Sequence, residues 1–212
     1  MMVSPHYVYN ELKTKSDKEV LAEIRRFRRE ISYAKKELAS PITEDMILSP
    51  CPETRISMNR EYIDAAKRIL FERGIEYKPT RAEQRSEEFN DCLSDLMEII
   101  VIREGYFIGR NQYIVICGNR NQVVHYENRR RTDDGASKSW IIERDLKSFV
   151  SDLEDLYIGE WKKYYYADAL DGEQWEIMFV FADGAMSKFT GSNAYPYNFD
   201  MLMGILGIDD EY

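Results

Sequence analysis

The sequence has few of the residues that build common catalytic and metal sites. Its 212 residues include only two histidines, His6 and His125, and three cysteines, Cys51, Cys92 and Cys117. Two distant histidines cannot supply the usual imidazole cluster, and three widely spaced cysteines favour reduced, buried thiols over a disulfide framework or a zinc site. No phosphate-binding glycine loop occurs either. We therefore expect no metal and no cofactor, and the sequence gives no positive sign of an enzyme.

One pair of these residues still invites a catalytic interpretation. A cysteine beside a basic histidine can become a nucleophilic thiolate, so Cys117 and His125 could form the dyad of a thiol protease. If a four-residue loop separates Cys117 from Gln122, strand alternation places the thiol and the imidazole on opposite faces of the sheet. Only a shift of one residue in the register would unite them. We expect no such dyad.

Long apolar runs are also missing from the chain. No stretch approaches the roughly 18 apolar residues that a membrane-spanning helix needs. The first residues lack the apolar centre of a signal peptide. We therefore expect a cytoplasmic protein with no membrane partner.

Positive charge is scarce in the last part of the chain. The net charge is -9, and residues 151–212 alone carry 13 acidic and only 3 basic side chains. Such a surface repels nucleic acid and attracts basic partners, although an acidic face can also serve solubility alone. The candidate contact residues on this acidic face are Asp152, Glu154, Asp155 and Glu160.

Helical signals fill the first part of the chain, residues 1–95. Ser16 with Glu19, and Thr80 with Glu83, form capping boxes, in which the two side chains satisfy backbone donors at a helix start. After the first box, apolar residues recur at alternating spacings of four and three, which predicts a long helix with a narrow packing seam. The second box predicts a shorter helix.

The long helix needs a partner, and the sequence offers one nearby. A second helix is expected over about residues 57–73, and Gly74 is its stop signal. Three prolines between residues 40 and 54 predict an irregular crossover between the two helices. We expect a helical hairpin within the chain, because the seam is too short to favour a coiled-coil dimer.

From residue 96 the periodicity changes from helical to extended. Strands are expected over residues 97–103, 112–117, 122–127, 160–167 and 173–181, with a short strand at Trp140. Two helices, over about 143–156 and from about 198, complete this region. The predicted fold class is α+β: an N-terminal helical hairpin region, 1–95, and a mainly antiparallel sheet of about five to six strands with two helices, 96–212. The two regions could also form one continuous domain.

The register of the last hairpin can be predicted. A two-residue loop, Asp183-Gly184, would place Lys188 opposite Phe179 on the buried face. A three-residue loop that includes Ala182 places Ser187 there instead. We therefore predict a three-residue loop with Gly184 in the left-handed region. The side chains expected to face the core are Trp175, Ile177, Phe179, Phe181 and Phe189.

The last fifth of the chain also carries a recognisable pattern of turns and aromatic residues. It resembles a family of uncharacterised bacterial proteins that end in D-G-x-x-W-x-I, a D-G turn and G-S-N-A-Y-P-x-N-F. The resemblance implies a shared module of bacterial or phage origin, with no activity attached to it. The matching residues are Asp171, Gly172, Trp175, Ile177, Asp183, Gly184, Gly191, Ser192, Asn193, Ala194, Tyr195, Pro196, Asn198 and Phe199.

Two further segments are candidate binding sites. The run Arg129, Arg130 and Arg131 lies in a predicted loop and could contact phosphate, although Asp133 and Asp134 follow it closely. The G-S-N-A-Y-P segment could form a binding rim. Its candidate residues are Ser192 and Asn193, which offer hydrogen bonds, and Tyr195, which offers a flat apolar surface; a purely structural role is the alternative.

These observations favour a non-enzymatic protein that binds another protein. One specific hypothesis is a phage or mobile-element inhibitor whose acidic C-terminal face competes with nucleic acid for a basic groove of a nucleic-acid-handling complex. An alternative is direct nucleic-acid binding through Arg129–Arg131. The weakest alternative is an enzyme with an unrecognised site.

Overall fold

The computed structural model describes residues 3–38, 50–106, 108–128, 138–169 and 172–208. The chain folds as two compact units, Met1–Lys78 and Pro79–Tyr212, called here the helical unit and the sheet unit. This division falls earlier than the boundary expected after residue 95. The helix that follows Thr80 belongs to the second unit, because Phe89 and Leu93 are buried in the core of the sheet unit.

The described residues of the helical unit form three helices, α1 (Pro5–Lys13), α2 (Asp17–Leu38) and α3 (Pro52–Glu72). The sequence did not predict α1. Its signals are local: the Ser4 side chain accepts a hydrogen bond from the backbone N–H of Tyr7 at 3.3 Å, and a proline occupies the first turn. Proline also opens α3, which therefore begins before the expected residue 57.

α2 and α3 form the expected hairpin, with a shared core. One half of the predicted Ser16–Glu19 capping box is seen at the start of α2: the backbone N–H of Ser16 donates to Glu19 Oε2 at 2.8 Å, and the Ser16 hydroxyl donates to the same atom at 2.6 Å. Gly74 follows α3 with a φ of 69°, as expected of a helix stop. The crossover between the helices falls largely outside the described residues. The core of the unit is formed by Val8, Leu12, Val20, Ile24, Phe27, Tyr62, Ile63, Ala66, Ile69 and Leu70.

The sheet unit is built on one sheet whose strand order is β4-β3-β2-β1-β6-β7-β5. Neighbouring strands are antiparallel except β5 and β7, which are parallel. The seven strands among the described residues slightly exceed the expected five to six, and the α+β class is confirmed. The strands are β1 (Leu96–Gly105), β2 (Gly109–Ile116), β3 (Asn121–Asn128), β4 (Lys138–Ile142), β5 (Tyr164–Tyr166), β6 (Glu173–Phe181) and β7 (Met186–Ser192).

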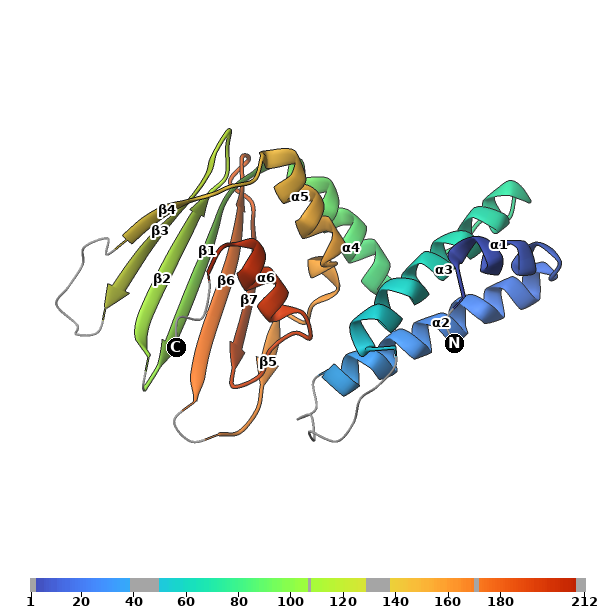
Figure 1. Cartoon of the computed structure of the whole chain (residues 1–212), viewed down its shortest axis with the longest axis horizontal. Helices are drawn as coiled ribbons and strands as arrows, with labels where there is room; N and C mark the ends of the chain where they lie inside the picture. The colour runs from blue at the N-terminus through green and yellow to red at the C-terminus, as the bar shows by residue number, and fades with distance from the viewer. Residues whose placement is uncertain (1–2, 39–49, 107, 129–137, 170–171, 209–212) are drawn as a thin grey trace. The chain divides into compact units, whose positions relative to one another are not determined.

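Three helices, α4 (Arg81–Cys92), α5 (Leu146–Asp155) and α6 (Phe199–Ile205), lie on one face of this sheet (Figure 1). Two short 3-10 turns, η1 (Leu93–Asp95) and η2 (Ile158–Glu160), extend this helix layer. The Thr80–Glu83 capping box is present at the start of α4. Between the helices and the strands lies one core, in which Phe149 and Leu153 of α5 and Leu202 of α6 are fully buried.

The last hairpin has the predicted register. Ile177 is paired with Phe189 and Phe179 with Ser187, and the backbone N–H of Phe181 donates to Ala185 O at 3.0 Å. Gly184 has a φ of 83°, in the left-handed region. All five side chains predicted to face the core, Trp175, Ile177, Phe179, Phe181 and Phe189, are buried.

Trp175 joins the sheet to the chain that follows β7. Its indole lies directly on Gly191, where an added Cβ would be 2.3 Å from the ring atom Cε2. The indole N–H donates to Ala194 O at 2.9 Å, and the ring packs against Phe199 with 5.0 Å between centroids. Only glycine fits at position 191 while Trp175 keeps this place.

The close approach at Gly191 predicts a large loss of stability on a small substitution. We expect Gly191→Ala to lower the free energy of unfolding by about 1–3 kcal/mol, because the new methyl group overpacks against Trp175. Gly204→Ala in α6 is the matched control: nothing lies within 4 Å of its Cβ position. That control should be neutral or stabilising, because alanine favours helix. Urea denaturation compares the variants, and equal midpoints for Gly191→Ala and the natural protein would contradict the packing described.

Candidate functional site

The G-S-N-A-Y-P segment serves the fold through Asn193. This residue has a φ of 55°, and its side-chain Nδ2 donates to Ala167 O at 3.3 Å and to Ala169 O at 3.4 Å. An added Cβ on Gly172 would be 1.4 Å from Asn193 Oδ1, so the glycine is required by this contact. Asn193 therefore holds Ala167 and Ala169, which follow β5. Ser192 ends β7, where its carbonyl accepts from the N–H of Ala167 at 3.0 Å.

Tyr195 also has its main interactions within the chain. Its hydroxyl donates to Glu173 Oε2 at 3.1 Å, and Glu173 forms an ion pair with Arg103, which is only 9% exposed. The Tyr195 ring stacks on Trp175 with 6.1 Å between centroids. Although 37% of Tyr195 is exposed, its polar and apolar atoms both serve the fold.

Asn198 makes hydrogen bonds inside the sheet unit. The sequence had indicated it only as a member of the G-S-N-A-Y-P-x-N-F pattern. It is buried, its Oδ1 accepts from Trp161 Nε1 at 3.0 Å, and its Nδ2 donates to Leu156 O at 2.8 Å. Together with Asn193 and Tyr195 it shows that the pattern encodes a fold. Of the predicted binding rim, only the edge of Tyr195 is well exposed.

The predicted acidic residues do not form one equivalent set. Asp152 is ion-paired with Arg144, and Glu160 in η2 is partly buried. Glu154 and Asp155, at the end of α5, are exposed. Of the four predicted residues, Glu154 and Asp155 therefore remain candidates for contact with a partner protein.

Sequence reasoning missed four acidic residues that lie on the same helix layer. Glu87, Glu88 and Asp91 of α4 and Asp95 of η1 are all exposed. The α4 and α5 groups are neighbours, because Asn90 Nδ2 donates to Glu154 O at 3.5 Å. Their sequence distance hid this proximity, which only the packing of α4 beside α5 creates. The acidic helix surface consists of Glu87, Glu88, Asp91, Asp95, Glu154 and Asp155.

The electrostatics of this surface are unfavourable for the isolated fold. Glu87 and Asp91 are spaced i,i+4 on α4, a spacing at which like charges destabilise a helix. Asp91, Glu154 and Asp155 lie in the last turns of α4 and α5, where the helix dipole disfavours negative charge. Neither last turn contains a basic residue. Helix stability therefore does not account for these carboxylates.

The run Arg129, Arg130 and Arg131 lies outside the described residues. Nucleic-acid binding through these arginines stays a prediction. A gel shift with and without their replacement by alanine tests it directly.

Cys117 and His125 require a correction. Tyr113 pairs with His125 and Val115 with Val123, so the loop between β2 and β3 is one residue longer than expected and the two residues share a face. They still form no dyad. About four residues of strand, roughly 13 Å, separate Cys117 from the Tyr113–His125 pair. The His125 Nε2 atom lies 3.0 Å from Asn111 Oδ1.

Burial also makes Cys117 a poor nucleophile, because desolvation raises the pKa of its thiol to about 12. The expectation of three buried cysteines was wrong for two of them. Cys51 and Cys92 are exposed, and all three thiols are free.

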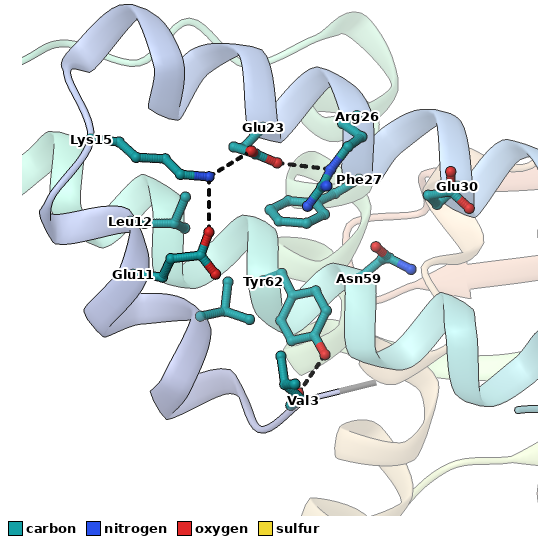
Figure 2. A pocket seen from close by; sticks show the side chains of 11 residues that line it. Val3, Glu11, Leu12, Lys15, Glu23, Arg26, Phe27, Glu30, Asn59 and Tyr62 are labelled. Atoms are coloured by element: carbon teal, nitrogen blue, oxygen red, sulfur yellow. Dashed lines mark hydrogen bonds and ion pairs between the residues drawn. The ribbon is translucent and has the colours of Figure 1, made fainter. Parts of the chain in front are cut away.

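The helical unit contains a groove of about 260 Å³ between α1, α2 and α3 (Figure 2). Lys15 Nζ bridges two carboxylates, at 2.7 Å from Glu23 Oε1 and 3.1 Å from Glu11 Oε1, and Arg26 Nε lies 2.8 Å from Glu23 Oε2. Ligand pockets typically have roughly 300–1,000 Å³. The groove is smaller than this, and most of its charged groups pair with each other. Its described lining has no histidine, cysteine or serine.

The described residues form neither a candidate metal site nor a membrane span. No group of three or more histidine, cysteine or carboxylate side chains there is placed to hold a metal ion. No described helix is both long and apolar enough to cross a membrane. Comparisons of the chain with protein-family models, curated proteins and solved structures gave no match. The bacterial or phage resemblance of the C-terminal pattern stays a prediction.

Thiol labelling tests the placement of the cysteines. We expect the native protein to react rapidly at two thiols, Cys51 and Cys92, and the third thiol to react only after denaturant is added. A Cys51→Ser/Cys92→Ser variant should therefore be inert while folded. Fast labelling of that variant at pH 8 would show that Cys117 is accessible, against its position in the core.

Removal of one hydroxyl tests whether Tyr195 is structural. Tyr195→Phe keeps the ring contacts with Trp175 and Phe199 but loses the hydrogen bond to Glu173, so the free energy of unfolding should fall by about 1 kcal/mol. Tyr195→Ala removes the ring as well and should cost more. Chemical denaturation measures both, and a Tyr195→Ala variant as stable as the natural protein would assign the residue to a surface role instead.

Proposed function

We propose that this chain is a non-enzymatic, cytoplasmic protein-interaction module of a bacterium or its phage. In this proposal the acidic helix surface binds a basic groove in a nucleic-acid-handling complex and inhibits that complex by competing with nucleic acid. The observation that carries the proposal is the grouping of exposed carboxylates at the C-terminal ends of α4 and α5.

The division of charge between the two units supports a basic partner. Residues 79–212 carry 25 acidic and 14 basic side chains, whereas residues 1–78 carry 13 acidic and 15 basic ones. The excess of negative charge therefore belongs entirely to the sheet unit. A concentrated field of one sign speeds association with an oppositely charged partner and lowers the affinity for nucleic acid.

The position of the carboxylates supports a role outside the fold. Asp91, Glu154 and Asp155 oppose the helix dipole and have no basic residue in the same turn. A surface that served only the stability of the helices would gain by placing lysine or arginine there. A basic partner supplies the missing positive charge from outside. The three free thiols are typical of a reducing compartment and support a cytoplasmic location.

Salt-dependent capture tests this function. The tagged full-length chain is incubated with the heparin-retained proteins of a nuclease-treated bacterial lysate, a fraction rich in basic nucleic-acid-binding proteins. We expect a bound protein that elutes as NaCl rises and that added duplex DNA displaces. The triple variant Asp91→Asn/Glu154→Gln/Asp155→Asn should retain about tenfold less of it, because each surface charge contributes roughly 0.2–1 kcal/mol.

The control removes the same charge from the other unit. Glu53→Gln/Glu61→Gln/Glu76→Gln neutralises three exposed carboxylates of the helical unit and should leave capture unchanged. The triple variant of the acidic helix surface should unfold at the same or a higher denaturant concentration than the natural protein, which separates binding from folding. If the two triple variants captured equal amounts of the basic protein, the proposal would be contradicted.

A further inference from the structure

The face of the sheet opposite the helix layer carries an apolar row that crosses four strands. Within the described part of the sheet unit no helix packs on this face, called here the uncovered face (Figure 1). Val124, Ile114, Ile100 and Met178 are successive cross-strand partners on β3, β2, β1 and β6. These four residues form the apolar row, and all are partly exposed.

The apolar character extends to the rows on either side. On one side of the apolar row, the neighbouring row contains Ile116 and Val180 with Glu98 between them. On the other side, the neighbouring row contains Ile102 between Gln112 and Glu176. An antiparallel sheet whose second face meets water normally places polar residues on that face. Here the apolar row continues over four strands until Ser139 and Lys188 end it, and polar residues such as Glu98, Gln112 and Glu176 mix with apolar ones only in the rows beside it. A contiguous apolar area with a polar border is typical of an interaction surface.

The dimensions of this area fit one helix. Four strands span about 14 Å across the sheet, and the rows from Val180 to Ile102 span about 13 Å along it. A helix is about 10–12 Å wide, and three turns are about 16 Å long. The opposite face of the same strands already packs against helices through Phe149, Leu153 and Leu202, so the twist of this sheet accommodates helices.

The charges on the uncovered face select the kind of helix. Glu98 and Glu104 lie on β1, about 20 Å apart along the strand, one on each side of the apolar row. Arg110 lies opposite Glu104 on β2, but neither glutamate takes part in an ion pair within the described residues, whereas Glu176 pairs with Lys188. Cations near both ends of an apolar helical stripe would reach the two carboxylates. The same carboxylates disfavour nucleic acid and anionic lipid surfaces.

A second copy of the chain fits this face less well. A two-fold axis in the plane of the contact and centred on β1 would bring like charges together in either orientation. If the axis is parallel to β1, Glu98 and Glu104 each face the same residue of the second copy. If the axis is perpendicular to β1, Glu98 of each copy faces Glu104 of the other. Burial of facing carboxylates is costly. A partner with basic residues removes this conflict.

We propose that the uncovered face binds an amphipathic helix of a partner protein whose axis runs along β1, so that its apolar stripe crosses the apolar row at Ile100 and a basic residue lies toward each of Glu98 and Glu104. This site is separate from the acidic helix surface, which lies on the other side of the sheet. The inference therefore goes beyond the proposed function and does not depend on it.

A patterned peptide is the probe. An acetylated and amidated helical peptide of about 18 residues carries leucine at positions i, i+4, i+7 and i+11 and lysines near both ends. Its control has the same composition with the leucines permuted so that no stripe forms. We expect the patterned peptide to bind the full-length chain, measured by fluorescence anisotropy, and the permuted peptide to bind at least about tenfold more weakly, since each leucine that the contact buries contributes about 1.5–3 kcal/mol.

Variants of the chain locate the binding. Ile114→Thr/Met178→Thr removes apolar area but keeps residues that strands tolerate, and it should weaken binding at least about tenfold. Phe71→Thr/Met201→Thr makes a similar chemical change at exposed positions on helices, away from the uncovered face, and should leave affinity unchanged. Glu98→Gln/Glu104→Gln should remove most of the dependence of affinity on NaCl. Circular dichroism confirms that each variant is folded.

Several results would overturn the proposal. It fails if the patterned peptide does not bind, if the permuted peptide binds equally well, or if the row variant keeps full affinity. A dimer in sedimentation that Ile114→Thr/Met178→Thr dissociates would identify a second copy as the occupant instead. The triple variant of the acidic helix surface should bind the peptide normally, so failure of the proposed function and failure of this site are distinguishable.

Discussion

The packing of Trp175 on Gly191 is the constraint on which the sheet unit depends. The indole reaches across from β6 to β7 and fills the space that a side chain at position 191 would need. Its N–H donates a hydrogen bond to Ala194 O, which holds the chain that follows β7. That chain then carries Tyr195 back to Glu173 and Phe199 onto the Trp175 ring. α6 is only seven residues long, so its place on the sheet follows from these contacts rather than from helix propensity.

The Trp175 contacts place α6 in the helix layer, and this layer makes the two faces of the sheet chemically different. One face shares a core with α4, α5 and α6, and the outer surface of those helices concentrates carboxylates. The other face carries the apolar row with Glu98 and Glu104 on either side. Neither surface contains a nucleophile beside a base, and the buried thiol of Cys117 is held protonated by its environment.

The sequence predicted the elements whose signals are local or strictly periodic. The capping box at Thr80, the three-residue loop at Gly184 and the inward face of β6 follow from turn chemistry and alternation, and the structure confirms them. The register of β2 with β3 was wrong because nothing in residues 118–121 fixes the length of their loop. The helix α1 was not predicted, because its only buried residues are Val8 and Leu12, which are too few to give a clear helical periodicity.

The candidate surfaces were harder to predict than the fold, because they join residues that are distant in sequence. Asn90, next to Asp91, meets Glu154 only when α4 packs beside α5. Likewise, Ile100, Ile114 and Met178 read as ordinary strand residues until the pairing places them in one row. Their exposure depended on which face the helices would cover, and the alternation of apolar residues on both faces of β1 left that choice open.

Carbene footprinting of the free, full-length protein tests most directly whether one face of the sheet is left open for a partner. A small photoactivated diazirine labels side chains in proportion to their accessibility, and mass spectrometry locates the label. The account predicts labelling of Ile100, Ile114 and Met178, and protection of their strand neighbours Val101, Val115 and Ile177, which are fully buried. Equal protection of both sets would show that the uncovered face is closed in the free protein, which would contradict its role as a binding surface.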